Sequence, residues 1–198
     1  MFLFKLKLNI FKSFLTLSFM KKVKTGREFV YSIFIRYFLL IIAALPNFWI
    51  FYFIFTPLTV YPVYFFLNIL FGATLFGNFI FIADYYPPIE IIGACVAGAA
   101  YYLLLILNLS VPNIKTKKRI KMLCFAFLSF LIVNILRIIS LSVILVLKPG
   151  LFDITHKLSW YLGSIVLVVA IWFIEVKKFK IKAIPVYSDL KSISKYIK

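Results

Sequence analysis

The 198-residue chain is 64% hydrophobic and 20% aromatic, with a mean hydropathy of +1.05. Soluble domains contain about 45–50% apolar residues, so this composition excludes an ordinary soluble fold and predicts an integral membrane protein with one domain. The formal net charge of +17 is of the size found in nucleic-acid-binding proteins. The basic residues are instead grouped between apolar stretches, so we do not expect nucleic acid as a partner.

The Lys and Arg residues fall into three groups. Eight precede Tyr37, five lie in 115–121 and seven lie from Lys177 onward, whereas none lies between Arg36 and Lys115. Basic loops resist translocation across a membrane, so these groups mark the cytosolic side. They can also bind anionic lipid headgroups there.

The basic N-terminal segment 1–27 mixes large apolar residues with a polar stripe. The polar residues that recur at helical spacing are Lys5, Asn9, Lys12 and Thr16. We expect an amphipathic helix on the cytosolic membrane face, because lysines interrupt the apolar core that a cleaved signal peptide needs. A transmembrane catalytic domain should follow over 28–176, and a basic cytosolic tail over 177–198.

Four transmembrane helices are expected in the plasma membrane. The first runs from about Phe29 to Phe55, with a kink at Pro46. The other three cover about 95–111, 120–147 and 156–174. This arrangement places both chain ends in the cytosol.

The apolar stretch 57–83 is expected to stay on the outer side. A crossing there would move the basic loop 115–121 outside, against the positive-inside rule. We expect a helix over 57–71 that lies in or dips into the outer interface. A β-hairpin should follow, with strands at 79–83 and 89–92 joined by a turn at 84–88.

The hairpin should pack on protein at the external surface, because irregular or edge backbone is not tolerated facing lipid in the hydrocarbon region. The predicted fold class is therefore an all-α polytopic membrane protein. It has about four transmembrane helices, interfacial helices and a short extracytoplasmic β-hairpin.

This topology brings three reactive residue types to the outer face. Cys95 opens the second span, and His156 opens the fourth. Arg137 lies 18 positions after Arg119, roughly 27 Å along the third span. Asn134, three residues before Arg137, shares its helix face. Small residues at the outer end of the second span allow another helix to approach closely.

Each of these residues also has a purely structural interpretation. Arg137 could extend to lipid headgroups, His156 could be a surface or capping residue, and Cys95 could be a small buried hydrophobe. Asp153 or Thr155 could cap the last helix. Asp153 could alternatively orient the imidazole.

The coincidence of thiol, guanidinium and imidazole at one depth favours an enzyme. A thiolate and a His form a nucleophile–base pair, and an Arg can bind an oxyanion or a substrate carboxylate. A helix N-terminus and a nearby Arg would favour the Cys95 thiolate. Cys124, near the cytosol, is expected only to pack and to be out of disulfide reach. One His and one external Cys are too few to bind a metal, and we expect no cofactor.

Three sequence features together resemble the exosortase/archaeosortase family. They are Ala-Cys-Val-Ala-Gly at 94–98, Asn134-Ile-Leu-Arg137, and the position of His156 at the start of the last span. The likeness covers about residues 28–175 and is nearest to compact archaeosortases. It implies Cys95 as nucleophile, Arg137 as the essential arginine and His156 as acid/base. Many relatives carry a hydroxyl residue after the cysteine, whereas this chain has Val96.

The resemblance implies a membrane-embedded cysteine transpeptidase or protease that processes C-terminal sorting signals of exported proteins at the extracytoplasmic membrane surface. Its partners would be membrane-anchored proteins with a C-terminal sorting tail, and lipids, with a lipid amine or water resolving the intermediate. Asn134, Asp153 and Glu90 are candidate supporting residues; Glu90 could bind substrate or be an exposed strand acid. The alternative is a non-catalytic scaffold or small-solute carrier, although four spans without pseudo-symmetry argue against a carrier.

Overall fold

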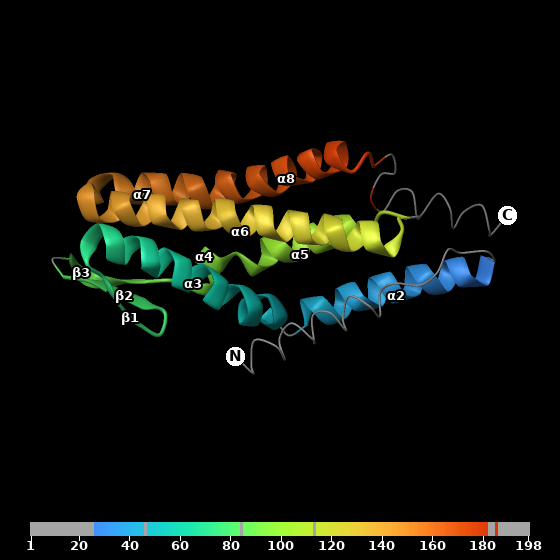
Figure 1. Cartoon of the computed structure of the whole chain (residues 1–198), viewed down its shortest axis with the longest axis horizontal. Helices are drawn as coiled ribbons and strands as arrows, with labels where there is room; N and C mark the ends of the chain where they lie inside the picture. Colours follow the sequence, from blue (N-terminus) through green and yellow to red (C-terminus); the bar gives the residue numbers. More distant parts are fainter. Residues whose placement is uncertain (1–25, 46, 84, 113, 182–184, 186–198) are drawn as a thin grey trace.

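The computed structural model describes residues 26–181 except 46, 84 and 113, together with residue 185 (Figure 1). The amphipathic segment predicted for 1–27 lies almost wholly outside the described residues, as do the kink at Pro46 and most of the tail. The helices are α2 (Gly26–Ala44), α3 (Trp49–Phe71), α4 (Gly93–Val96), α5 (Gly98–Leu109), α6 (Thr116–Leu147), α7 (Pro149–Leu158) and α8 (Ser164–Lys178), with a π-helical turn, η1 (Ser159–Gly163), between the last two.

Helix α6 is the longest element, and α3, α5, α7 and α8 pack on it (Figure 1). Its buried residues recur at helical spacing; they include Met122, Leu123, Ala126, Phe127, Phe130, Asn134 and Ile138. On α5, the buried Tyr101 ring stacks on Phe55 of α3 at a centroid distance of 3.7 Å and meets Phe130 edge-on at 4.8 Å. These ring contacts pack α3 and α5 against α6.

Helices α3 and α6 are each long and apolar enough to cross a membrane. The segments Pro149–Tyr161 and Ser164–Lys178, bent by 43°, could together form a third crossing by length and composition. Shorter apolar helices cover Ile33–Ala44 and Gly93–Leu109. These lengths agree with a membrane protein, whereas the count of four crossings stays a prediction.

The predicted first span, 29–55, is wrong in its boundaries. The helix breaks after Ala44 and begins again at Trp49. Asn47 and Phe48 in the break have left-handed backbone, with φ of 50° and 58°. Asn adopts that conformation more readily than other non-glycine residues, whereas an aromatic residue such as Phe48 rarely does.

The helix predicted over 57–71 is the C-terminal part of the longer α3. Pro57 and Pro62 lie inside it, although a proline removes one helical hydrogen bond. Neighbouring groups satisfy the freed carbonyls in membrane helices, where a full break would leave more backbone unpaired. The prolines therefore do not end the helix.

A small antiparallel sheet confirms the predicted hairpin and extends it. Its strands β1 (Thr74–Phe76), β2 (Phe79–Ile82) and β3 (Tyr85–Glu90) lie in that order. The predicted turn was too long: Pro87 and Pro88 lie within β3, an edge strand where a proline costs no internal ladder bond. The sheet lies beside the C-terminal part of α3, at the end of the molecule where α6 leads into α7 (Figure 1).

The span predicted to begin at Cys95 is broken. Helix α4 ends at Val96, Ala97 takes a left-handed φ of 59°, and α5 begins at Gly98. The Tyr52 ring of α3 lies against Gly93 and Gly98. The small residues therefore admit a neighbouring helix, as predicted, and it approaches through an aromatic ring.

The last helical segment begins earlier than predicted. Helix α7 starts at Pro149, a residue suited to a first helical turn because it lacks an N–H there. Asp153 and Thr155 lie inside this helix, so neither caps it. The Thr155 hydroxyl donates instead to the Leu151 carbonyl, at 2.8 Å.

Replacing Gly98 by Ala should destabilise the fold. The new Cβ would lie 2.8 Å from Tyr52 Cζ, so the ring must shift, and overpacking of this kind costs about 1–3 kcal/mol. Gly150→Ala is the control, because no atom lies within 4 Å of its Cβ position. The free energy of unfolding in mixed micelles measures the difference; equal values for both variants would contradict the tight contact.

Candidate active site

A cavity of about 520 Å³ lies between β3 and the helices α4, α6 and α7. Cys95 of α4, Arg137 of α6 and His156 of α7 all line it, and so does Glu90 at the end of β3. The rest of the wall is mostly apolar and includes Pro87, Ile92, Ile138, Leu141, Leu145 and Trp160. The fold thus brings the three predicted reactive residues to one space.

Asn134 holds the backbone that carries the thiol. Its side-chain amide donates to the Cys95 carbonyl at 2.9 Å, next to the helix break at Ala97. The Asn134 side chain is fully buried, and it lies one helical turn before Arg137. One face of α6 therefore both supports the cysteine and presents the cation.

Arg137 of α6 is half-buried, and a residue of α8 holds its side chain in place. Its Nη1 donates to the Ser164 hydroxyl of α8 at 2.7 Å, while its buried Nε has no hydrogen-bond partner in the described part of the chain. The Arg137 guanidinium and the Glu90 carboxylate line the same cavity as the Cys95 thiol. A charge of each sign therefore lies in the same cavity as the sulfur.

His156 is half-buried, and its imidazole stacks on the Phe152 ring, with centroids 5.1 Å apart and planes 8° apart. Phe152, His156 and Trp160 lie four residues apart, so one side of this helical segment lines the cavity. Within the described residues, no hydrogen bond joins His156 to Cys95 or Arg137. The three side chains face a shared space that a substrate could occupy, and catalytic contacts commonly tighten only on binding.

Of the three candidate supporting residues, two lie at the site and one does not. Asn134 contacts the Cys95 backbone and Glu90 lines the cavity. Asp153 is exposed and, in the part of the chain that is described, makes no hydrogen bond or ion pair with His156. The structure does not support the idea that Asp153 orients the imidazole.

The expected helix-dipole effect on Cys95 is not supported. Helix α4 has only four residues, and α5 begins after the break at Ala97, so few aligned peptide dipoles point at the thiol. Arg137 is the positive group near the sulfur. Cys124, predicted to pack, is exposed on α6. Among the described residues, no group of three His, Cys, Asp or Glu side chains could hold a metal.

Two parts of the site were missed in the sequence. Phe152 and Trp160 follow the four-residue spacing around His156 and could have been found from it. Ser164 could not, because its contact with Arg137 depends on how α8 packs on α6 after the π-helical turn η1. Such turns widen a helix locally and are frequent at functional sites.

Comparisons with known proteins give no match: neither a family model, nor a curated protein, nor a solved structure matches this chain. The chemistry of the cavity therefore carries the functional argument. A thiol, a guanidinium, an imidazole and a carboxylate line one cavity, and the rest of its wall is mostly apolar. That combination suits an apolar substrate segment held beside a nucleophile.

Replacing Asn134 by Ala should cost about 1–3 kcal/mol of stability, because it removes the buried partner of the Cys95 carbonyl. Ser140→Ala on the same helix is the control, since the exposed Ser140 hydroxyl bonds only to the Leu136 carbonyl of its own helix. Thermal unfolding of the purified variants compares the two. Equal stability would show that Asn134 does not hold the α4 backbone.

Proposed function

We propose that the protein is a membrane-embedded cysteine transpeptidase or peptidase that processes C-terminal sorting signals of exported proteins. One observation carries the proposal: Cys95, Arg137 and His156, from three different helices, line one cavity of about 520 Å³. A volume of this size is typical of ligand sites. The likeness of the motifs around these residues to exosortases and archaeosortases supports the same roles.

In the first step, the Cys95 sulfur forms a bond to the carbonyl carbon of the scissile peptide, and His156 accepts the thiol proton. The carbonyl electron pair moves onto oxygen, where Arg137 donates hydrogen bonds to the oxyanion. The C–N bond then breaks, and His156 gives the proton to the leaving amine.

In the second step, an amine or water attacks the thioester that remains on Cys95. The new nucleophile loses a proton to His156, and the sulfur leaves as thiolate. A lipid amine would give an anchored product and water a released one. The freed C-terminal helix of the substrate would stay in the bilayer.

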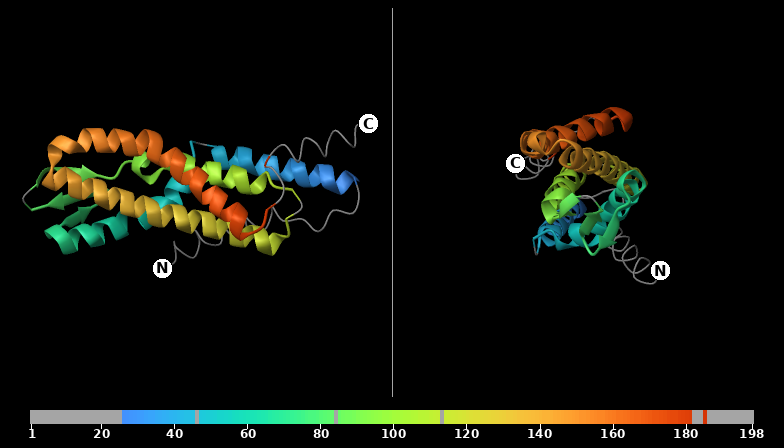
Figure 2. Two further views of the ribbon diagram at one scale, coloured as in Figure 1. Left: turned by 90° about the horizontal axis from the view of Figure 1, so that it is seen from above. Right: turned by 90° about the vertical axis from the view of Figure 1, so that its left-hand side faces the viewer.

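The distribution of basic residues supports an extracytoplasmic cavity. Lys117, Lys118 and Lys121 lie at the start of α6, and Lys177 and Lys178 end α8. Those helix ends lie near each other, on the side of the molecule toward which α2 extends, whereas the sheet and the α6–α7 turn lie at the opposite end (Figure 1, Figure 2). By the positive-inside rule the basic end is cytosolic, so the cavity would open toward the outer side.

Three single variants test the proposal: Cys95→Ala, Arg137→Gln and His156→Ala. In the source cells each should accumulate surface proteins that keep their C-terminal tails. Cys95→Ala should abolish processing, and loss of a general acid–base lowers rates by about 10²–10⁴-fold. Proteomics of C-terminal peptides measures this, with Cys124→Ala as the control. Normal processing in all three would favour a scaffold or carrier.

A further inference from the structure

One face of the small sheet is aromatic and uncovered. The pairs Thr74–Phe81 and Phe76–Phe79 lie opposite each other across β1 and β2, so their side chains share one face. Ile80 and Ile82, on the other face, are buried in the core. Together with Tyr86 of β3, the exposed rings form what we call the aromatic face: Phe76, Phe79, Phe81 and Tyr86.

Exposure on this face is highest at the rings of β1 and β3 and lower at those of β2. Phe76 is 78% exposed and Tyr86 is 90% exposed. Contiguous apolar patches on a protein surface mark contacts with another protein or with a membrane. The aromatic face therefore needs a partner outside the described chain.

The aromatic face adjoins the apolar surface of α3. Exposed side chains along the C-terminal half of that helix are Tyr61, Phe65, Phe66, Ile69 and Leu70, and α3 contacts β1 and β2 directly. No Lys or Arg occurs between Arg36 and Lys115; the acidic residues in that stretch are Asp84 and Glu90, and Glu90 pairs with Phe79 at the end of β3. The aromatic face therefore carries no basic residue, and it is continuous with a helix that is long and apolar enough to cross a membrane.

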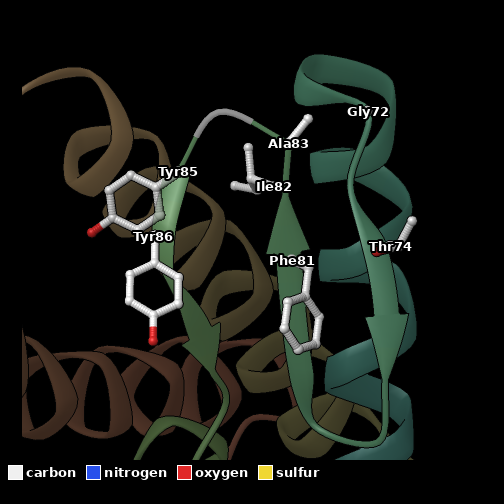
Figure 3. A pocket seen from close by; sticks show the side chains of 7 residues that line it. All are labelled: Gly72, Thr74, Phe81, Ile82, Ala83, Tyr85 and Tyr86. Carbon is white, nitrogen blue, oxygen red and sulfur yellow. The ribbon is translucent and has the colours of Figure 1, made fainter.

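A shallow hollow of about 610 Å³ lies at the tip of the sheet (Figure 3). Its lining residues are Gly72, Thr74, Phe81, Ile82, Ala83, Tyr85 and Tyr86. Phe81 extends from β2 and Tyr86 from β3, with the Tyr86 hydroxyl at the far end of its ring (Figure 3). A tyrosine ring with its polar end is of the type enriched at the boundary between lipid headgroups and acyl chains, whereas the phenylalanine rings are wholly apolar.

The depth of the sheet fits that boundary. Lys121 and Lys148, near the two ends of α6, are 27 residues apart, about 40 Å of helix. That length matches a bilayer with its headgroup regions, about 40–45 Å. The sheet lies beside the end of α6 that leads to Lys148 (Figure 1), and so at the level of one headgroup region.

The sheet edges are also compatible with a poorly hydrated environment. Unpaired backbone groups are costly in lipid. The edge strand β1 has only three residues, and the edge strand β3 contains Pro87 and Pro88, which have no N–H to leave unpaired. Both edges therefore expose few backbone donors.

We infer that the aromatic face and the adjoining surface of α3 rest in one leaflet of the lipid bilayer, at the boundary between headgroups and acyl chains. The hairpin was expected to pack on protein; its buried face does so, and its other face contacts lipid. This contact is independent of catalysis. Strand β3 also forms a wall of the Cys95 cavity. The lipid contact would therefore bring that wall to the membrane surface, where a membrane-anchored substrate chain emerges.

Spin labels on a background with both cysteines replaced by serine test the inference. Labels at Phe76→Cys and Phe81→Cys, and at the smaller change Thr74→Cys, are compared in phosphatidylcholine–phosphatidylglycerol vesicles. Collision rates are measured with oxygen, which concentrates in lipid, and with a water-soluble nickel chelate. Ile132→Cys, exposed at mid-length of α6, is the lipid reference, and Lys117→Cys, exposed in the first turn of the same helix, is the aqueous reference.

We expect the sheet labels to collide with oxygen severalfold more often, relative to nickel, than the label at Lys117 does. Nickel collisions equal to those at Lys117 would place the face in water and overturn the inference. Low collision rates with both reagents would also overturn it, because they would show that protein, such as a second copy, covers the face. Catalytic activity enters neither result.

Discussion

The hydrogen bond from Asn134 to the Cys95 carbonyl is the interaction on which the candidate site depends. It joins α6, the helix on which α3, α5, α7 and α8 pack, to a one-turn helix that would otherwise end in an unsupported break. Ala97 takes a left-handed conformation at that break, which costs a non-glycine residue about 1–3 kcal/mol unless the surroundings fix it. The Tyr52 ring of α3 also packs against Gly93 and Gly98 and so supports the same stretch of backbone.

From this contact the remaining geometry follows along α6. Arg137 lies one turn after Asn134, and its guanidinium is held by Ser164, so α8 is tied to the same part of the helix. The chain turns back at Lys148, and His156 of α7 lines the same cavity as the thiol. Three helices thus each contribute one reactive group, and the cavity itself is a consequence of how they pack.

The sequence was informative where charge and composition dominate. The apolar helices, the hairpin and the meeting of Cys95, Arg137 and His156 at one cavity were predicted from apolar lengths, strand-type runs and basic clusters. Helix boundaries were less predictable. The helix predicted over 57–71 begins earlier, at Trp49, and no local signal at Ala97 reveals a break that Asn134 stabilises from another helix. Ser164 was missed for the same reason, since its role depends on long-range packing.

The most direct measurement is the rate at which a membrane-impermeant maleimide modifies Cys95 in intact cells, for the native protein and for Arg137→Gln. A nucleophilic cysteine reacts as its thiolate, which a nearby guanidinium favours. We expect Cys95 to be labelled without permeabilisation and several times more slowly once Arg137 is replaced, while Cys124 stays unlabelled. Labelling of Cys95 only after permeabilisation, or an unchanged rate in Arg137→Gln, would contradict an extracytoplasmic nucleophile activated by Arg137.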